Sequence, residues 1–445
     1  MKLKKDTHIT PLKKYYIETY GCQMNEYDSE LVAGLLEKEQ YSRAESSDEA
    51  QLVLLNTCSV REHAEEKVHA RLGNLKILKD QDPDVKIGVL GCMAQNLKDD
   101  LLKSKPYVDF ILGPDSYRKL PTMLSASDAP PEDSIDTRLS RMEVYDDLFP
   151  ARREGINAWI SIMRGCDKFC TFCIVPFTRG RERSRSLEGI VEEVQHIVAQ
   201  GFKEVTLLGQ NVNSYIHEGR RFHELLEAVS QVEGIQRVRY TSPHPQDFDD
   251  DLISLHSSNS KVCNHIHFPL QAGSDRVLER MNRTYTQAHF IKLGEKMREQ
   301  IPGLSLSTDM IVGFPGETEN DFQETLKVMQ QLKFDTAFTF KYSARPGTKA
   351  AEFEDTVTEE DKQDRLQRMI ELQRVHTLER NQAHIGEILE ILVEKDSKKS
   401  EKQHQGRTRS NKIVIFDKGS EQPGDLVNVE ITDAQGITLF GRVVN

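Results

Sequence analysis

The sequence predicts an α/β protein in three parts: an N-terminal open parallel α/β sheet, a central partial (β/α)6 barrel similar to a TIM barrel, and a small C-terminal β-barrel. Apolar strand patterns alternate with helical patterns in the first part. The second part repeats a strand followed by a helix six times. The last part contains short strand patterns only. At 445 residues the chain is also too long for one ordinary core. We place the sheet, a linker, the barrel and the C-terminal module at residues 14–125, 126–150, 151–380 and 383–445.

The N-terminal part contains three short apolar runs that suit buried parallel strands, each followed by a helical stretch. The runs are residues 15–20, 51–57 and 86–91, and the helical stretches are 25–40, 61–80 and 95–104. A βαβαβα order of this kind predicts an open parallel sheet. The Ser-, Asp- and Pro-rich composition after residue 125 predicts the linker.

The central part repeats a βα unit, which predicts a barrel whose chemistry lies at the C-terminal ends of its strands. The expected strands are residues 158–165, 204–211, 237–242, 265–271, 306–314 and 337–343. A long charged helix is expected from Thr358 to Gly386. Four further strands, at residues 387–394, 412–417, 425–432 and 437–444, predict the C-terminal barrel.

Composition narrows the class of protein. With 37% hydrophobic and 29% charged residues and no long apolar run, a membrane protein is not expected. The net charge of −12 argues against a chain that coats nucleic acid non-specifically. The basic N-terminus lacks the apolar segment of a secretory signal, so a cytoplasmic, reducing location is expected. There, metal binding or catalysis is a better reading of the seven cysteines than disulfides.

Three of the cysteines, Cys166, Cys170 and Cys173, crowd into eight residues directly after the first barrel strand. A zinc ribbon uses two separated pairs instead. Three thiolates on one loop can hold three irons of a cubane 4Fe–4S cluster and leave the fourth iron open for a ligand. The spacing therefore predicts a cluster with an open coordination position, and a structural zinc site or inert buried thiols are the alternatives.

Three more cysteines, Cys22, Cys58 and Cys92, are far apart in sequence, yet each follows one of the three N-terminal strands. Neighbouring ends of parallel strands converge on one edge of a sheet, where ligands bind. The sequence therefore predicts a second three-cysteine metal site there, with buried core cysteines as the alternative. The seventh, Cys263, has no partner at a suitable spacing and is expected to be a buried free thiol.

The two triads in this order, with the strings TYGCQMNEYDSE, NTCSVREHAEEK, GCDKFCTFCIVPFTRGRERSR, LLGQNVNSY, TSPHP and FKYSARPGTKA, resemble the radical-SAM methylthiotransferase family from Tyr16 to Val444. The strings are most similar to the tRNA-modifying (MiaB) branch. The ribosomal-protein branch typically has Pro-Lys after its first cysteine, where this chain has Gln23-Met24, and the branch acting on threonylcarbamoyladenosine also differs there. By this resemblance, the C-terminal module is a TRAM domain, an RNA-binding barrel.

The resemblance implies a reaction and its cofactors. A methylthio group would be added to C2 of N6-isopentenyladenosine next to the anticodon, at tRNA position 37, with two S-adenosylmethionines and two 4Fe–4S clusters, the N-terminal one as the sulfur source. A tRNA anticodon stem-loop and an electron donor such as flavodoxin or ferredoxin are the expected partners of a monomer. The alternatives are a ribosomal-protein side chain or threonylcarbamoyladenosine as substrate, or a non-catalytic iron–sulfur RNA-binding protein.

Several further residues are candidates for binding S-adenosylmethionine, because they lie at barrel strand ends or beside the cluster loop. For each of them turn formation is an equally good reading. They are Phe172, Gly209, Gln210, Asn211, Ser242, Gln271, Ser274, Gly313 and Tyr342.

Two basic runs are candidates for RNA contacts. Residues 395–412 hold seven Lys and Arg against two acids, a net of +5, and would form either a phosphate-binding loop or a solvated hairpin. Arginines at alternate positions follow the cluster loop and could face RNA or pair with acids. The candidates are Arg179, Arg181, Arg183, Lys398, Lys399, Lys402, Arg407 and Arg409.

Overall fold

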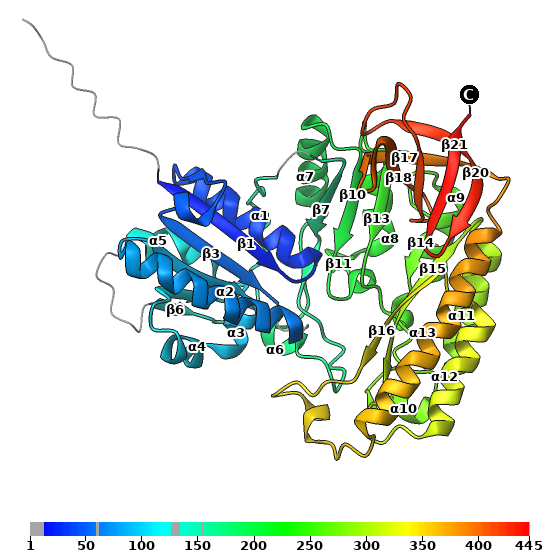
Figure 1. Ribbon diagram of the computed structural model, residues 1–445, viewed down its shortest axis with the longest axis horizontal. Coiled ribbons are helices and arrows are strands. Elements are labelled where there is room, and N and C mark those ends of the chain that lie inside the picture. The colour runs from blue at the N-terminus through cyan, green and yellow to red at the C-terminus, as the bar shows by residue number, and fades with distance from the viewer. Residues whose placement is uncertain (1–12, 59–61, 126–133, 153–154, 445) are drawn as a thin grey trace, which may run out of the picture. The chain divides into compact units, whose positions relative to one another are not determined.

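The computed structural model describes residues 13–58, 62–125, 134–152 and 155–444 (Figure 1). The chain divides into two compact units. Unit 1 comprises residues 1–153 together with 177–180, and unit 2 comprises residues 154–176 and 181–445. None of the described helices combines the length and apolar character needed to cross a bilayer.

Unit 1 is built on a six-stranded, wholly parallel sheet. Its strands are β1 (Lys14–Tyr20), β2 (Ser42–Arg43), β3 (Leu52–Thr57), β4 (Lys86–Gly91), β5 (Phe110–Leu112) and β6 (Ile135–Asp136), in the order β2-β1-β3-β4-β5-β6. The direction of progression reverses between β1 and β3. In open α/β sheets such a reversal creates a crevice at the C-terminal strand ends, where ligands bind.

Helices cover both faces of this sheet. They are α1 (Gln23–Lys38), α2 (Glu62–Gln81), α3 (Cys92–Leu97), α4 (Asp99–Ser104) and α5 (Leu120–Ser125). Successive residues of β3 belong to different cores, since Leu52 and Leu54 pack in one apolar cluster and Val53 and Leu55 in the other. Burial on both faces explains why β3 is a continuous apolar run, which is the signal that predicted it.

The segment predicted as a linker differs from that expectation over its described part, residues 134–150. Its strand β6 extends the sheet by pairing with β5. Tyr145 is buried, stacks on Tyr117 with ring centroids 5.8 Å apart, and donates a hydrogen bond to the carbonyl of Pro114. A few apolar anchors spaced along a polar segment are enough to hold it on the core, although its composition is typical of a loop.

The central part of unit 2 is a parallel partial barrel, which confirms the predicted fold class. One half-sheet contains β7 (Asn157–Ser161), β10 (Glu204–Leu208) and β13 (Arg237–Tyr240), and the other contains β14 (His265–His267), β15 (Ser305–Val312) and β16 (Thr336–Lys341). Surrounding helices are α7 (Leu187–Ala199), α8 (Phe222–Ser230), α9 (Asp250–Ser258), α10 (Asp275–Arg280), α11 (Gln287–Gln300), α12 (Glu319–Leu332) and α13 (Glu359–Gln382).

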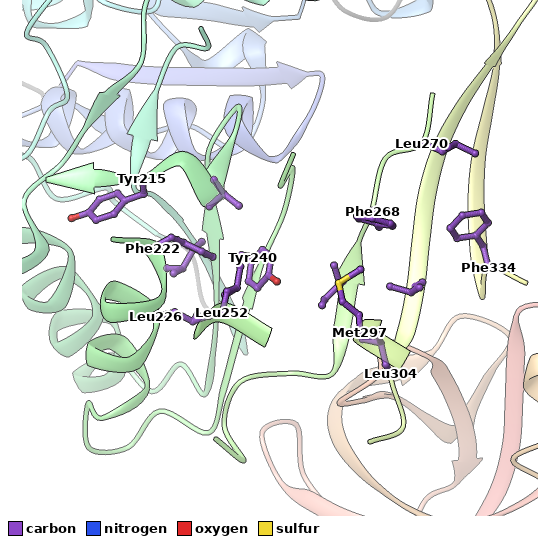
Figure 2. Close-up of a cluster of buried hydrophobic side chains, with 14 of the residues drawn as sticks. Tyr215, Phe222, Leu226, Tyr240, Leu252, Phe268, Leu270, Met297, Leu304 and Phe334 are labelled. Atoms are coloured by element: carbon purple, nitrogen blue, oxygen red, sulfur yellow. The ribbon is translucent and has the colours of Figure 1, made fainter. Parts of the chain in front are cut away.

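One continuous apolar core holds the two half-sheets and their helices together. Figure 2 shows Phe222, Leu226 and Tyr240 near the first half-sheet and Phe268 and Phe334 near the second. The long helix expected near residue 358 is α13, whose N-cap Thr358 accepts a hydrogen bond from the amide of Asp361. Because this core is shared, the loops at the strand ends are fixed relative to one another within unit 2.

The C-terminal module is a closed five-stranded barrel of β17 (Ile388–Ser397), β18 (Ser400–Thr408), β19 (Ile413–Asp417), β20 (Leu426–Gln435) and β21 (Thr438–Val443). Four of these strands were expected, and β18 was not. Its buried positions are His404, Gly406 and Thr408, which are polar or small. Burial therefore alternates along the strand, but hydrophobicity does not, and the sequence shows no strand pattern. The run 395–412 is therefore mainly hairpin strand rather than loop.

Buried basic groups join this barrel to the strand starts of the central barrel. Arg237, the first residue of β13, donates hydrogen bonds to the carbonyls of Arg407 and Glu390. Lys412 Nζ lies 2.8 Å from a carboxylate oxygen of Asp335, the residue before β16. The C-terminal barrel is thus docked at the end of the central barrel where the strands begin, opposite the end at which they finish.

Candidate iron–sulfur sites

The central cysteines lie on a loop at the C-terminal end of the first barrel strand, as predicted. The strand continues into β8 (Met163–Arg164), which pairs antiparallel with β9 (Arg183–Ser184) and closes the base of the loop. Gly165, with φ of +81°, turns the chain into Cys166, and its amide donates a hydrogen bond of 2.5 Å to Gln210 Oε1. A loop anchored at its base can present several thiols to one ligand.

Residues 280–283 hold this loop in place through hydrogen bonds. Thr171 donates hydrogen bonds to the carbonyls of Met281 and Arg280, and Asn282 donates to the carbonyl of Phe169. Arg283 Nη1 lies 3.4 Å from the sulfur of Cys170. The loop is therefore held by backbone and side-chain contacts, and one of its sulfurs faces a permanent positive charge.

The ionisation of these thiols fits a metal site. Burial raises the pKa of Cys166 to about 11 and that of Cys173 to about 12. Without metal they are neutral thiols, and metal binding would displace their protons. Three cysteines on one loop, with the guanidinium of Arg283 beside one of them, suit the thiolate ligands of an iron–sulfur cluster.

Neither triad is arranged as a single-ion site. Two thiolates on one tetrahedral zinc stand roughly 4 Å apart, because each Zn–S bond is about 2.3 Å. Among the described residues, the one group of three possible ligands whose atoms all lie within 4.8 Å of one another is His223, Asp249 and Asp251. Wider spacing is what a cluster requires, since each cysteine binds a different iron.

The N-terminal cysteines follow a single row of paired residues across the sheet. Tyr20 of β1 pairs with Thr57 of β3, which pairs with Gly91 of β4. Cys58 and Cys92 come one residue after this row and Cys22 two residues after it. The row spans the point where the strand order reverses, so the predicted three-point site coincides with the crevice at the C-terminal sheet edge.

Glycines beside two of these cysteines permit the close approach. A Cβ at Gly21 would lie 2.6 Å from Cys58 Cβ, and one at Gly91 would lie 2.4 Å from Asn56 Oδ1. Both glycines have positive φ, +151° and +91°. The strand edge is thus shaped so that its loops can converge only if these positions lack a side chain.

Buried amides cross-link the same loops. Asn25 donates hydrogen bonds to Asn56 Oδ1 and to the carbonyl of Thr57, while Asn56 donates to the carbonyl of Asn25. The thiol of Cys22 lies 3.3 Å from Asn25 Oδ1. This network fixes the loop after β1 against the loop after β3, which supports the thiols from behind.

Charge at the N-terminal site is dominated by Arg179. A hydrogen bond from Cys58 lowers the pKa of Cys22, and the nearby guanidinium lowers it further. Burial raises the pKa of Cys92, and Arg179 opposes that rise. Burial of Arg179 would lower its own pKa, but Cys92, Asp28 and other anionic groups raise it well above its ordinary value.

The residues predicted to bind S-adenosylmethionine lie at strand ends of unit 2, some with structural contacts. Ser242 and Gln271 have left-handed backbones, with φ of 59° and 65°, and such outliers cluster at functional sites. Tyr342 Oη is buried with no hydrogen-bond partner among the described residues. Ser274 donates to Asp321, and the amide of Gly313 donates to Glu317.

The other predicted cofactor residues surround the cluster loop. Phe172 meets Phe314 edge-on, with centroids 6.4 Å apart. At Gly209 a Cβ would lie 2.8 Å from Met163 Cγ, so a side chain there would push into the loop's base. Asn211 Nδ2 donates to Asp247, while its Oδ1 is buried and lacks a partner among the described residues.

The predicted RNA-binding residues separate into exposed and buried groups. Lys398, Lys399 and Lys402 are exposed on the β17–β18 hairpin, and Arg181 is exposed beside the cluster loop. The partly buried Arg407 pairs with Glu394, and Arg409 donates to the carbonyl of Val262. The expectation is corrected for Arg179 and Arg183, which are 4% and 7% exposed. Arg179 pairs with the buried Asp28, so of the two partners considered for this arginine, RNA or an acidic side chain, the structure shows the acidic side chain.

Sequence reasoning missed the contacts of Arg283 and Asn25 and the burial of Arg179. Nothing in the sequence links Arg283 to Cys170, which stands 113 residues earlier. Asn25 could have been found, because it follows Cys22 by three residues in the first turn of a helix. Cys263 is a buried thiol, as expected.

The fold and the central loop define the class of protein: a radical S-adenosylmethionine enzyme. The Radical SAM superfamily matches residues 160–329, the Uncharacterized protein family UPF0004 residues 14–113 and the TRAM domain residues 382–444. The fold is similar to the radical S-adenosylmethionine methyltransferase TsrM from Kitasatospora setae, with TM-score 0.56 and 15% identity over 76% of this chain and 75% of that one.

Full-length relatives identify the branch. The chain is 45% identical to a tRNA-2-methylthio-N(6)-dimethylallyladenosine synthase of Acetivibrio thermocellus, over 100% of this chain and 94% of the relative. It is 48% identical to the synthase of the same name from Porphyromonas gingivalis, over 97% and 95%. The chain therefore belongs to the tRNA-2-methylthio-N(6)-dimethylallyladenosine synthase family, which confirms the predicted MiaB branch.

Proposed function

We propose that this chain adds a methylthio group to C2 of N6-isopentenyladenosine at tRNA position 37. The names of its full-length relatives give the reaction, and the row Tyr20–Thr57–Gly91, which gathers Cys22, Cys58 and Cys92, carries the proposal for this chain. A second cysteine site distinguishes an enzyme that inserts sulfur from a radical enzyme that needs only the cluster at which the radical is generated. Methylthiolation of a ribosomal protein has no such support among these relatives.

Cys166, Cys170 and Cys173 would hold a 4Fe–4S cluster, and S-adenosylmethionine would bind its open iron. Bound there, the pair supplies one-electron chemistry that can attack an unactivated C–H bond, which acid–base side chains cannot do. The protein's part is to hold the loop, through Gln210 and residues 280–283, and to surround the ligand with the strand-end residues described above. Tyr342 and Asn211 have buried polar atoms available for that ligand.

Cys22, Cys58 and Cys92 would hold a second 4Fe–4S cluster that provides the sulfur. The three thiols, of which Cys58 and Cys92 are buried, suit such a group, as do the flanking glycines and the Asn25–Asn56 network. The target base would have to leave its stack to react, as in other base-modifying enzymes. A cytoplasmic enzyme that receives electrons from a small redox protein and acts as a monomer fits this reaction.

The exposed lysines of the TRAM barrel would bind tRNA backbone by counterion release. Since this barrel is docked at the strand starts of the central barrel, its RNA contacts would fall away from the reacting nucleotide. The domain would then position the stem of the tRNA and leave recognition of the base to the strand-end loops.

Anaerobic reconstitution and analysis of tRNA test the proposal. The wild-type chain, with reductant, S-adenosylmethionine and isopentenylated tRNA, should yield 2-methylthio-N6-isopentenyladenosine in nucleoside digests and 5′-deoxyadenosine. A chain with Cys22, Cys58 and Cys92 replaced by Ala should still cleave S-adenosylmethionine but form no methylthio product. Product formation by that variant, or a methylthio group on protein instead of tRNA, would refute the proposal.

A further inference from the structure

Arg179 is a buried cation in the N-terminal unit. Its side chain is 4% exposed, and Nη2 lies 2.9 Å from Oδ2 of Asp28, whose side chain is fully buried. Tyr117 Oη lies 3.4 Å from the same oxygen. Taking a guanidinium and a carboxylate out of water is costly, and a single ion pair seldom offsets the cost. The position therefore calls for further partners.

Those partners are the thiols of the N-terminal site. Burial would lower the pKa of Arg179, and Cys92 and Cys22 are near enough, together with Asp28, to raise it. The guanidinium is within hydrogen-bonding reach of the Cys92 sulfur. Asp28 belongs to α1, the helix capped by Cys22, so the carboxylate and the first cysteine are held by the same element.

The geometry explains what each group does. Asp28 accepts hydrogen bonds from Arg179 Nη2 and from Tyr117 Oη, so the carboxylate is itself held while it fixes one edge of the guanidinium. Asp28 lies on the helix that follows Cys22, so this contact keeps the positive charge beside the N-terminal cysteines. A cluster held by three thiolates is anionic, and in a buried place that charge needs compensation. An arginine suits this task because it stays charged and donates hydrogen bonds in a rigid plane.

We propose that Arg179 is a positioning residue of the N-terminal cluster, whose anionic sulfurs it neutralises while Asp28 holds it in place. This inference rests on the second cluster of the proposed function. It assigns a role to a residue outside the N-terminal sheet sequence, because Arg179 comes six residues after Cys173, the last ligand of the radical-SAM loop. The short segment from 173 to 179 thus carries a ligand of one cluster and the counter-charge of the other.

The test uses the full chain with Cys166, Cys170 and Cys173 replaced by Ala, so that only the N-terminal cluster is present. In this background Arg179→Met removes the charge but keeps much of the side-chain length, and Arg179→Lys keeps the charge. Iron and sulfide content after anaerobic reconstitution, the EPR spectrum and the midpoint potential are measured. These readouts do not depend on turnover.

Loss of a nearby positive charge disfavours the reduced, more negative cluster. Arg179→Met should therefore lower the midpoint potential by on the order of 60 mV, a tenfold change for one electron, and should lower the iron retained. Arg179→Lys should restore most of the potential. The matched control is Arg152→Met, since Arg152 is a buried arginine of the same unit that lies near Glu30 rather than the cysteines.

The outcomes are distinct. An unchanged potential and EPR spectrum in Arg179→Met, or an equal shift in Arg152→Met, would overturn the inference. If Arg179→Met does not fold, the midpoint potential of Arg179→Lys is compared with that of the parent chain instead. The inference requires the two potentials to be similar, because lysine preserves the charge. A large shift in Arg179→Lys would mean that the arginine has a structural role only, and would overturn the inference. A parent chain without iron would instead refute the second cluster, and with it the proposed function.

Discussion

Arg283 donates a hydrogen bond from Nη1 to the sulfur of Cys170, 3.4 Å away, although the two residues are 113 positions apart in the chain. The same guanidinium donates from Nη2 to the carbonyl of Pro269 and from Nε to Tyr285 Oη. The contact therefore ties the radical-SAM loop to the loop after β14, and it places a fixed positive charge on one cluster ligand.

Replacing Arg283 by Met should make the radical-SAM cluster harder to reduce. A hydrogen bond to a charged group contributes about 1.5–3 kcal/mol, so the midpoint potential should fall by on the order of 60 mV or more. An EPR-monitored redox titration of the chain with Cys22, Cys58 and Cys92 replaced by Ala measures it without the other cluster.

Arg276→Met is the control for this prediction, because Arg276 is an arginine of the neighbouring helix α10 that pairs with Asp321 and not with a cysteine. Its potential should match that of the parent. An Arg283→Met cluster with the parent's potential would mean that the contact holds the loop without tuning the metal.

Gly91→Ala should empty the N-terminal site and spare the radical-SAM site. The added Cβ would lie 2.4 Å from Asn56 Oδ1 and 2.6 Å from the Thr57 carbonyl oxygen, and the backbone has φ of +91°. The strand edge would have to move, and Cys92 moves with it. Iron content should fall toward half, while cleavage of S-adenosylmethionine to 5′-deoxyadenosine persists.

Gly73→Ala provides the comparison. Gly73 lies in helix α2, and a Cβ there meets no atom within 4 Å. Alanine in a helix is favoured over glycine by roughly 0.5–1 kcal/mol, so this variant should keep all of its iron. Equal iron in both variants would show that the close approach at Gly91 is unrelated to the site.

Sequence patterns predicted most of this molecule because the signals were local. A cysteine after each apolar strand, combined with the rule that parallel strand ends converge, was enough to predict that Cys22, Cys58 and Cys92 lie along one edge of the sheet. The register of Tyr20, Thr57 and Gly91 then gives that expectation a physical basis. The (β/α)6 barrel was equally visible, since each βα repeat has its own hydrophobic pattern.

The unpredicted features depend on pairings that no local pattern encodes. Strand β18 buries His404, Gly406 and Thr408, so its inward face is polar or small and resembles a loop. In the sequence, Arg179 is one of several arginines at alternate positions, and only the fold shows that it pairs with Asp28. Burial decides whether such an arginine meets RNA or an acid, and burial follows from tertiary structure.

Replacing Lys398, Lys399 and Lys402 by Ala should weaken tRNA binding and flatten its salt dependence. Each phosphate that the protein no longer neutralises reduces the slope of log affinity against log salt by about one, so the slope should fall by up to about three. Fluorescence anisotropy with an anticodon stem-loop at several salt concentrations measures both quantities.

For comparison, Lys327→Ala removes an exposed lysine of α12 that pairs with Glu324 and should leave the slope unchanged. Since the three lysines lie on the TRAM barrel, cleavage of S-adenosylmethionine without RNA should also be unchanged. A salt slope equal to that of the wild-type chain would place the RNA on another surface.

His256 should make unit 2 sensitive to acid. Burial lowers its pKa from 6.5 to about 4, a nearby Arg409 lowers it further, and a backbone contact with Cys263 opposes the shift. Its Nε2 lies 2.8 Å from Tyr240 Oη. Between pH 6.5 and 4 the unfolded chain binds a proton that the folded chain does not, so stability falls as the pH falls.

The slope expected from this one group is about 1.4 kcal/mol per pH unit. Denaturant unfolding at several pH values should show a steeper loss in the wild-type chain than in His256→Gln, whose amide does not titrate. The variant should be less stable than the wild-type chain at pH 7, and the gap should narrow toward pH 4. Parallel curves for the two chains would contradict the assignment.

The seven-residue segment from Cys173 to Arg179 should couple the two cluster sites. If the radical-SAM cluster orders this segment, losing it should loosen Arg179 and, through Asp28, the loop that begins with Cys22. Hydrogen exchange resolved by peptide measures this directly. In chains whose N-terminal site is loaded, replacing Cys166, Cys170 and Cys173 by Ala should speed exchange around residues 22–30 and 92–97.

The Arg179→Met variant completes a double-mutant cycle. Coupling between contacting groups is typically 0.5–3 kcal/mol, so a coupling of about 1 kcal/mol would speed exchange on the order of fivefold. If Arg179 carries the coupling, exchange around Cys22 and Cys92 is already fast in Arg179→Met, and removing the radical-SAM cysteines adds little. If the effects of Arg179→Met and of the three cysteine replacements on the free energy of exchange simply add, the two cluster sites are independent. The segment that connects them would then carry no coupling free energy.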